Sequence, residues 1–256
     1  FTKPWKMPLP ELGRHVADLG FGGIELPVRP GYQVEPENVS QGLPKAAKVL
    51  EEFGVRIASV AGPTDERTIA ACGEVGVPII RICVSIGPEG YLATEAAMRR
   101  RFDALLPALE KHGVAIGIQN HCDRCVGSAV GTRRLVEPYD PACVCAVWDA
   151  AHCALAGEPP ELAADILWSH LRLVNLKNAF WRRLTGPEAE VVRWGHYWTS
   201  GRQGLASWPK VASELKARGY QGDVCLTAEY SYVESVNCLV AEDLMFARSL
   251  FEQEIG

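Results

Sequence analysis

The chain alternates between short apolar runs and longer stretches in which apolar residues recur every three or four positions. The runs are at most seven residues long, rich in Val and Ile, and apolar at successive positions. Such runs are typical of parallel strands that are covered on both faces. Seven of them predict strands over Gly23–Val28, Val55–Val60, Pro78–Val84, Val114–Gln119, Val144–Asp149, Leu171–Lys177 and Asp223–Glu229.

The stretches between these runs carry the periodicity of amphipathic helices. In the first of them, Leu12, Val16 and Leu19 fall on one helical face. Several stretches end in a glycine just before the next run, as at Gly113, where glycine supplies the left-handed residue that ends a helix. We predict helices over Leu9–Leu19, Ala93–His112, Ser128–Val136, Pro160–Leu167, Ser207–Ala217 and Val236–Phe251.

The spacing of the runs indicates the fold class. Most of them start about 30 residues apart, which is the length of one strand–helix unit. An eighth strand could end at Phe1–Lys3, with its beginning lost, and eight such units in about 250 residues make a (β/α)8 TIM barrel. An open doubly wound sheet is the alternative, but no glycine-rich phosphate loop follows the first strand. We therefore predict a single barrel domain over residues 1–256.

Composition and charge exclude several classes of protein. Of the 256 residues, 48% are hydrophobic and 22% charged, which is too apolar for a disordered chain. The net charge of −5 and the lack of a basic run argue against nucleic acid as a partner, and no apolar run approaches the length of a membrane span. Nine cysteines in a core of this size need no disulfide framework, so we expect a reducing, cytoplasmic location.

Polar residues stand where the predicted strands end. In a barrel of this kind, the chemistry is built at the carboxyl ends of the strands and in the loops that follow them. One alternative is that these side chains only cap the barrel by hydrogen-bonding one another. Their convergence on one mouth favours a site. They are Glu25, Gln119, Asn120, His121, Asp149, His152, Asn175, Lys177 and Glu229.

Five motifs in order along the chain carry a resemblance to a known family. They are LGFGGIEL (19–26), IGIQNH (116–121), VWDAAHCALAGEPPE (147–161), LRLVNLKNA (171–179) and the stretch over 201–230 that ends at Glu229. Together they resemble the sugar phosphate isomerase/epimerase superfamily, the xylose isomerase-like barrels that include tagatose epimerases, inosose dehydratases and endonuclease IV. The endonuclease branch needs a histidine-rich cluster of several metals, which this acidic chain lacks.

The resemblance implies a divalent metal held by Glu, Asp, His and Glu on the last four strands. The matching positions here are Gln119, Asp149, Asn175 and Glu229, so two of the four ligands are amides. Amide oxygens are poorer ligands than the carboxylate and imidazole that they replace, and Gln119 cannot act as a base. We therefore expect Mg²⁺ or Mn²⁺ to be held weakly or not at all.

The resemblance also implies an activity: proton transfer next to a carbonyl in a small sugar, keto-sugar or polyol, by isomerisation, epimerisation or dehydration. The alternative is a non-catalytic or accessory barrel that binds a sugar-like ligand or a partner subunit. For the enzyme, we expect Glu229, Asp149, His152 and Lys177 to be catalytic. We expect Glu25, Gln119, His121, Asn175 and Arg182 to bind the substrate.

Two further segments invite an interpretation. The connection over 178–208 is unusually long and holds four of the seven tryptophans and four arginines, so we expect it to face the substrate through Arg182, to form a homo-oligomer interface, or both. Cys122 and Cys125 form a C-x-x-C motif, but no second such motif completes a zinc site. We expect these thiols to lie in an active-site loop without a metal or redox role.

Overall fold

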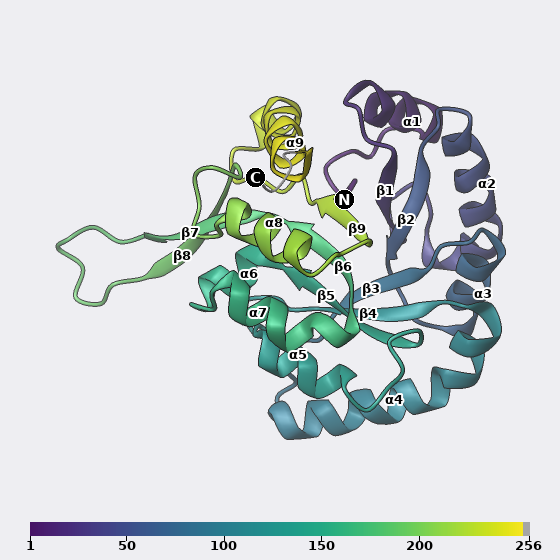
Figure 1. Ribbon diagram of the computed structural model, residues 1–256, viewed down its shortest axis with the longest axis horizontal. Helices are drawn as coiled ribbons and strands as arrows, with labels where there is room; N and C mark the ends of the chain where they lie inside the picture. The colour runs from purple at the N-terminus through teal and green to yellow at the C-terminus, as the bar shows by residue number, and fades with distance from the viewer. Residues whose placement is uncertain (253–256) are drawn as a thin grey trace.

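Seven parallel strands form the central sheet of the protein, whose computed structural model describes residues 1–252 (Figure 1). Each strand pairs with the one that follows it in this sheet, and a long connection separates the last two strands in the sequence. The strands are β1 (Gly23–Pro27), β2 (Arg56–Ala61), β3 (Ile79–Cys83), β4 (Ala115–Gln119), β5 (Val144–Asp149), β6 (Leu171–Leu176) and β9 (Asp223–Leu226), in this spatial order. This nearly closed sheet with helices outside confirms the predicted TIM barrel, although residues 253–256 of the predicted domain lie outside the described part.

The first two residues bridge the gap between the two edges of the sheet. The backbone nitrogen of Phe1 donates to the carbonyl of Leu226 on β9 at 2.6 Å, and that of Thr2 donates to the carbonyl of Glu25 on β1 at 3.1 Å. The segment therefore stands where an eighth strand was predicted. It does not form a regular strand.

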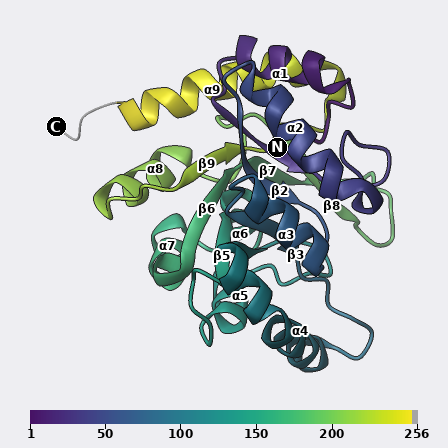
Figure 2. The same cartoon turned by 90° about the vertical axis from the view of Figure 1, so that its right-hand side faces the viewer.

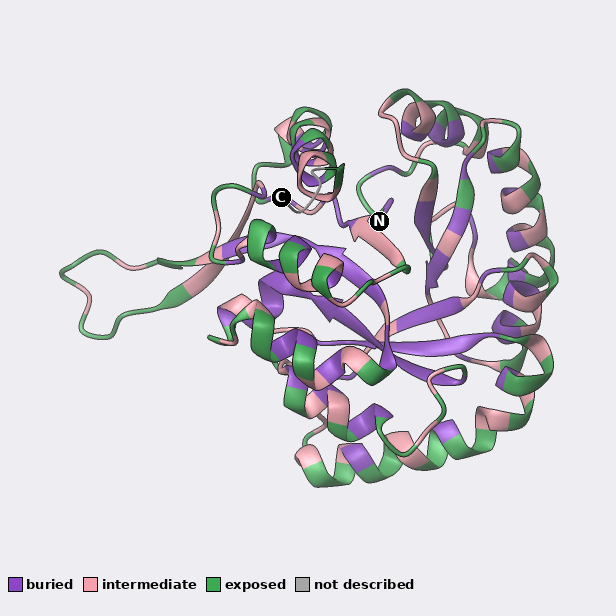
Figure 3. Ribbon diagram, in the orientation of Figure 1, coloured by how far each residue is buried: buried purple, intermediate pink, exposed green. Residues whose placement is uncertain are grey.

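The strands were predictable from the sequence because most of their residues are buried, on both faces of the sheet. Every residue of β4 and β5 is buried, because the barrel interior covers one face and the helices cover the other (Figure 3). Glycine is required at Gly117 of β4, where an added Cβ would lie 2.6 Å from a Val147 side-chain carbon. Gln119 and Asp149 end these two strands, so their side chains emerge at the same end of the barrel.

The helices pack around the outside of the sheet (Figure 2). They are α1 (Leu9–Asp18), α2 (Val39–Glu51), α3 (Glu66–Glu74), α4 (Tyr91–His112), α5 (Ala129–Val136), α6 (Ala150–Leu155), α7 (Pro160–Leu167), α8 (Trp208–Ala217) and α9 (Val236–Glu252). The helix predicted from Ala93 begins at Tyr91, and Gly113 ends it with the expected left-handed conformation, at φ 64°. No residue range was predicted for α2, α3 or α6; α2 contains Pro44, and α6 is only six residues long.

The long connection after β6 forms an antiparallel hairpin of β7 (Asn178–Arg183) and β8 (Trp194–Thr199). The hairpin projects well beyond the barrel, and its outer part is exposed (Figures 1 and 3). Its base is anchored by Asn178, whose side chain donates to the carbonyls of Gly201 and Ala206 and accepts from two backbone N–H groups. Among the described residues, no helix is long and apolar enough to cross a membrane.

Candidate active site

The register of the sheet brings the predicted polar residues together at its carboxyl edge. Asp149 of β5 is paired with Asn175 of β6, and Gln119 of β4 is paired with Cys83 of β3. Lys177 follows directly after β6. Because parallel strands share one carboxyl edge, these side chains lie together at one end of the barrel.

Asp149 is at the centre of a buried hydrogen-bond network. Its Oδ2 accepts from Nε2 of Gln119 at 2.7 Å, and its Oδ1 accepts from the backbone N–H groups of Ala151 and His152, so the residue also caps α6. Burial raises the pKa of Asp149 to about 6, and the nearby Lys177 ammonium limits that rise. A carboxyl group with such a pKa exchanges protons close to neutral pH.

The rings of His121 and His152 contact each other near this carboxylate, with centroids 4.1 Å apart and planes tilted by 35°. Nδ1 of His152 accepts the backbone N–H of Cys122 at 3.1 Å, so the neutral ring carries its proton on Nε2. That Nε2 is buried, has no hydrogen-bond partner, and lies 3.7 Å from Oδ2 of Asp149. Burial holds the pKa of His152 far below its usual range, so the ring is neutral. Its Nε2–H is therefore a hydrogen-bond donor without an acceptor.

Asn175 is fully buried, and neither atom of its amide has a hydrogen-bond partner. Burying an unpaired amide costs about 1–3 kcal/mol, and native proteins pair nearly all such groups. Together with Nε2 of His152, Asn175 therefore marks a place where a polar ligand would supply the missing bonds.

Glu229 is held between two lysines. Its Oε2 lies 2.6 Å from Nζ of Lys177, and its Oε1 contacts Nζ of Lys3. Burial alone would raise the pKa of Glu229, but the two ammonium groups outweigh it and hold that pKa well below its usual range. Lys177 also lies 3.7 Å from the ring centroid of Trp198, a cation–π contact that brings the base of the hairpin to the mouth.

A cleft leads from solvent to Glu229. It has a volume of about 580 Å³ and is lined by Lys3, Tyr32, Trp198, Glu229, Glu234 and Asn237, among others. The residue before Glu229, Ala228, has a φ of 50°, a left-handed conformation that costs a non-glycine residue about 1–2 kcal/mol. Strain of this kind is found at sites where the backbone must aim a particular side chain, here the carboxylate of Glu229.

Glu25 occupies the opposite half of the mouth and is fully paired. Ser59 donates to Oε2 at 3.0 Å, and Arg81 of β3 contacts both carboxylate oxygens. Burial would raise the pKa of Glu25, but Arg81 outweighs it and lowers that pKa. The guanidinium of Arg81 also lies over the ring of Phe1, 4.7 Å from its centroid.

The structure does not bring Arg182 to this group. Its side chain is exposed on the hairpin and packs over Tyr197. Sequence analysis also missed Arg81 and Lys3, which contact the predicted site residues. Arg81 lies inside an apolar run, so in the sequence it only interrupts the apolar pattern of a strand. Lys3 lies 226 positions before its partner Glu229, so the sequence does not indicate that the two are in contact.

This fold and this polar mouth define a xylose isomerase-like barrel. The chain belongs to the xylose isomerase-like TIM barrel family, whose model matches residues 14–250. It is similar to inosose dehydratase of Mesomycoplasma hyopneumoniae, with 25% identity over 126 residues. That match covers 47% of this chain and 42% of the relative, so the chain spans less than half the length of the relative it matches.

Solved structures resemble the barrel over nearly its whole length. The 3-keto-D-glucoside 4-epimerase from E. coli has a TM-score of 0.70 and 13% identity, with 94% of each chain covered. D-psicose 3-epimerase from Clostridium cellulolyticum H10, solved with D-tagatose, has a TM-score of 0.69 and 13% identity, with 96% of each chain covered. At these identities the likeness shows the fold alone.

Another relative, a xylose isomerase-like barrel from Mycobacterium smegmatis in complex with magnesium, has a TM-score of 0.68 and 17% identity over 94% of this chain and 87% of that one. In the present chain the four expected ligand positions do not fit a tightly held dication. Gln119 turns its Nε2 donor, rather than its oxygen, toward Asp149. Glu229 is already neutralised by Lys3 and Lys177, and Asn175 supplies only an amide.

Proposed function

We propose that the protein is a sugar isomerase or epimerase-like enzyme that transfers a proton next to a carbonyl of a small sugar, keto-sugar or polyol. The reaction class is isomerisation, epimerisation or dehydration. The observation that carries the proposal is the unpaired polar set at the mouth: the amide of Asn175 and the Nε2–H of His152. Hydroxyl and carbonyl oxygens of a sugar are the groups that satisfy such donors and acceptors.

The pair of Lys177 and Glu229 supplies the chemistry. A carbonyl oxygen of the substrate accepts a hydrogen bond from the Lys177 ammonium, which stabilises the negative charge that develops there when the neighbouring carbon loses its proton. Because Lys177 is the main cause of the low pKa of Glu229, drawing it toward the substrate makes the carboxylate a stronger base. Glu229 then takes the proton from carbon.

The buried side of the mouth positions the substrate and supplies a second proton carrier. His152 donates its Nε2–H to a sugar oxygen, and Asn175 and Gln119 hold further hydroxyl groups. Asp149, with a pKa of about 6, exchanges a proton near neutral pH and can return one to the substrate. Glu25 supports this arrangement from the paired half of the mouth.

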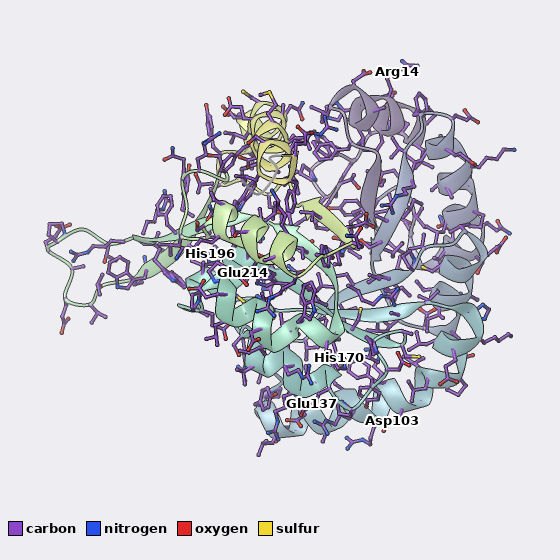
Figure 4. All side chains as sticks on the ribbon, viewed as in Figure 1. Arg14, Asp103, Glu137, His170, His196 and Glu214 are labelled. Atoms are coloured by element: carbon purple, nitrogen blue, oxygen red, sulfur yellow. The ribbon has the colours of Figure 1, made fainter. Side chains whose placement is uncertain are left out.

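Solvent-deuterium exchange tests the proposal directly. The protein, with and without added Mg²⁺ or Mn²⁺, is incubated in D₂O with a panel of ketoses and inosose-type polyols, and incorporation into carbon-bound positions is followed by NMR. We expect exchange in at least one sugar and a loss of about 10²-fold or more in Glu229→Gln and Lys177→Met. Glu137→Gln, an exposed change directly after α5, is the matched control (Figure 4). Exchange with no sugar under any condition would overturn the proposed reaction.

The replacement of two expected metal ligands by Gln119 and Asn175 favours a second candidate, a barrel that binds a sugar-like ligand without turning it over. Calorimetry separates the two, because this candidate binds a sugar from the same panel but exchanges no deuterium. A cytoplasmic location and a small carbohydrate as the partner complete the proposal.

A further inference from the structure

The loop after β4 and the hairpin bring Cys122, Asp123 and His196 together, and the proposed reaction uses none of these three side chains. Ligand atoms of Cys122, Asp123 and His196 lie within 4.8 Å of one another, and those of His121, Cys122 and His152 form an overlapping group with the same spacing. Cys122 is common to both groups. His196 comes from β8, more than 70 positions along the chain, and lies at the base of the hairpin (Figure 4).

We propose that Cys122, His121, Asp123 and His196 form a zinc site that ties the loop after β4 to the hairpin. One thiolate, one carboxylate and two neutral imidazoles offset the charge of a divalent ion. A thiolate with imidazoles is a set that Zn²⁺ prefers over Mg²⁺. The inference does not rest on the proposed function. It assigns His121 to the metal rather than to a sugar, and it gives Cys122 a metal role that the C-x-x-C motif alone did not indicate.

The hydrogen bonds select which histidines can take part. Nδ1 of His121 contacts the carbonyl of Cys122 at 2.9 Å, so it is the donor and leaves the lone pair of Nε2 free. Metal-bound histidines commonly donate their second ring N–H to a carbonyl in this way. His152 is excluded because its Nδ1 accepts from the backbone of Cys122 and its Nε2 carries the proton.

To hold the ion, the ligand atoms, which lie within 4.8 Å of one another in each group of three, must move closer together. Zinc–sulfur and zinc–nitrogen bonds of about 2.3 and 2.0 Å put tetrahedral ligand atoms roughly 3.3–3.8 Å apart. His196 and Asp123 already approach to 3.8 Å. Asp123 adopts a left-handed φ of 66°, which costs a non-glycine residue energy and turns the loop at this point. The charge of nearby Lys177 is offset by its ion pair with Glu229.

Zinc binding by the whole protein tests the site. We expect one equivalent of Zn²⁺ in competition with a chromophoric chelator, and a rise in the unfolding midpoint of roughly 5–10 °C at a hundredfold excess over Kd. Co²⁺ should give a thiolate-to-cobalt charge-transfer band. Cys122→Ser should abolish that band, and His196→Gln and His121→Gln should each weaken zinc binding more than about tenfold.

Matched variants distinguish this site from its neighbours. Cys125→Ser should leave zinc binding unchanged, because the Cys125 thiol lies against Ser85 instead. Glu229→Gln should also leave it unchanged. The proposal is overturned if the wild-type protein takes up no zinc, if Cys122→Ser still binds it, or if Cys125→Ser or Glu229→Gln is the variant that loses it. Circular dichroism of each variant verifies the fold.

Discussion

The two halves of the barrel mouth are built from similar residues but differ in how their polar groups are paired. On the side of β1 to β3, Glu25, Ser59 and Arg81 satisfy one another. On the side of β5 and β6, Asn175 and Nε2 of His152 have no partner, although both are just as buried. The polar groups of the paired half are satisfied within the protein, whereas the unpaired half leaves buried donors and acceptors without partners.

The largest expected effect comes from breaking the paired half. Arg81→Met leaves the Glu25 carboxylate buried without its cation, and removing one partner of a buried ion pair costs about 3–5 kcal/mol. Guanidinium unfolding should show this loss in the free energy of unfolding. The double variant Glu25→Leu/Arg81→Met should recover most of it. A loss below about 1 kcal/mol in Arg81→Met would show that the two halves do not differ as described.

Asp149 predicts a pH dependence of stability in the unpaired half. Its pKa is about 6 in the folded protein and ordinarily 3.8, so between these pH values the folded state keeps a proton that the unfolded chain has already lost. Stability should therefore fall as the pH rises from about 4 to about 6, by up to about 3 kcal/mol from this group. Asp149→Asn, which still caps α6, should remove that part of the slope in urea titrations at each pH. An unchanged slope would contradict the raised pKa.

In the unpaired half of the mouth, Asn175→Leu should affect sugar binding without lowering the free energy of unfolding. Replacing an unpaired buried amide with an apolar side chain of similar size should leave the free energy of unfolding unchanged or raise it by about 1 kcal/mol, while sugar binding is lost. Asn178→Leu is the matched control, because that amide makes four hydrogen bonds and its loss should cost about 2 kcal/mol or more. A large destabilisation by Asn175→Leu would mean that its amide is already paired.

The smallest effect on folding is expected in the hairpin, where the predicted homo-oligomer interface stays a prediction. Val191 and Trp194 are 72% and 58% exposed, and large apolar side chains gathered in this way are typical of interfaces. Val191→Ser/Trp194→Ser should change the free energy of unfolding by less than about 0.5 kcal/mol but reduce self-association in sedimentation velocity. A wild-type protein that is monomeric at all concentrations would contradict the interface.

The sequence carried enough information to predict the barrel but only part of the mouth. Strands such as β4 and β5 are buried throughout, so their runs of apolar residues are unbroken and end visibly at Gln119 and Asp149. The hairpin has no buried face along most of its length, so no apolar alternation marked its strands.

The pairing of the site residues depends on contacts between distant positions. Nothing near Glu229 in the chain indicates that Lys3 neutralises it, and nothing near Glu25 indicates Arg81. The chain therefore shows which residues reach the mouth but not which of them are already satisfied. That distinction required the three-dimensional arrangement.

The hairpin begins one residue after Lys177, at Asn178, and its other strand returns to place Trp198 over the same ammonium. The projecting hairpin is thus joined to Lys177 by a single peptide bond on one side and by a ring contact on the other. A partner that contacted the hairpin at Trp198 would therefore lie directly beside the ion pair of Lys177 and Glu229.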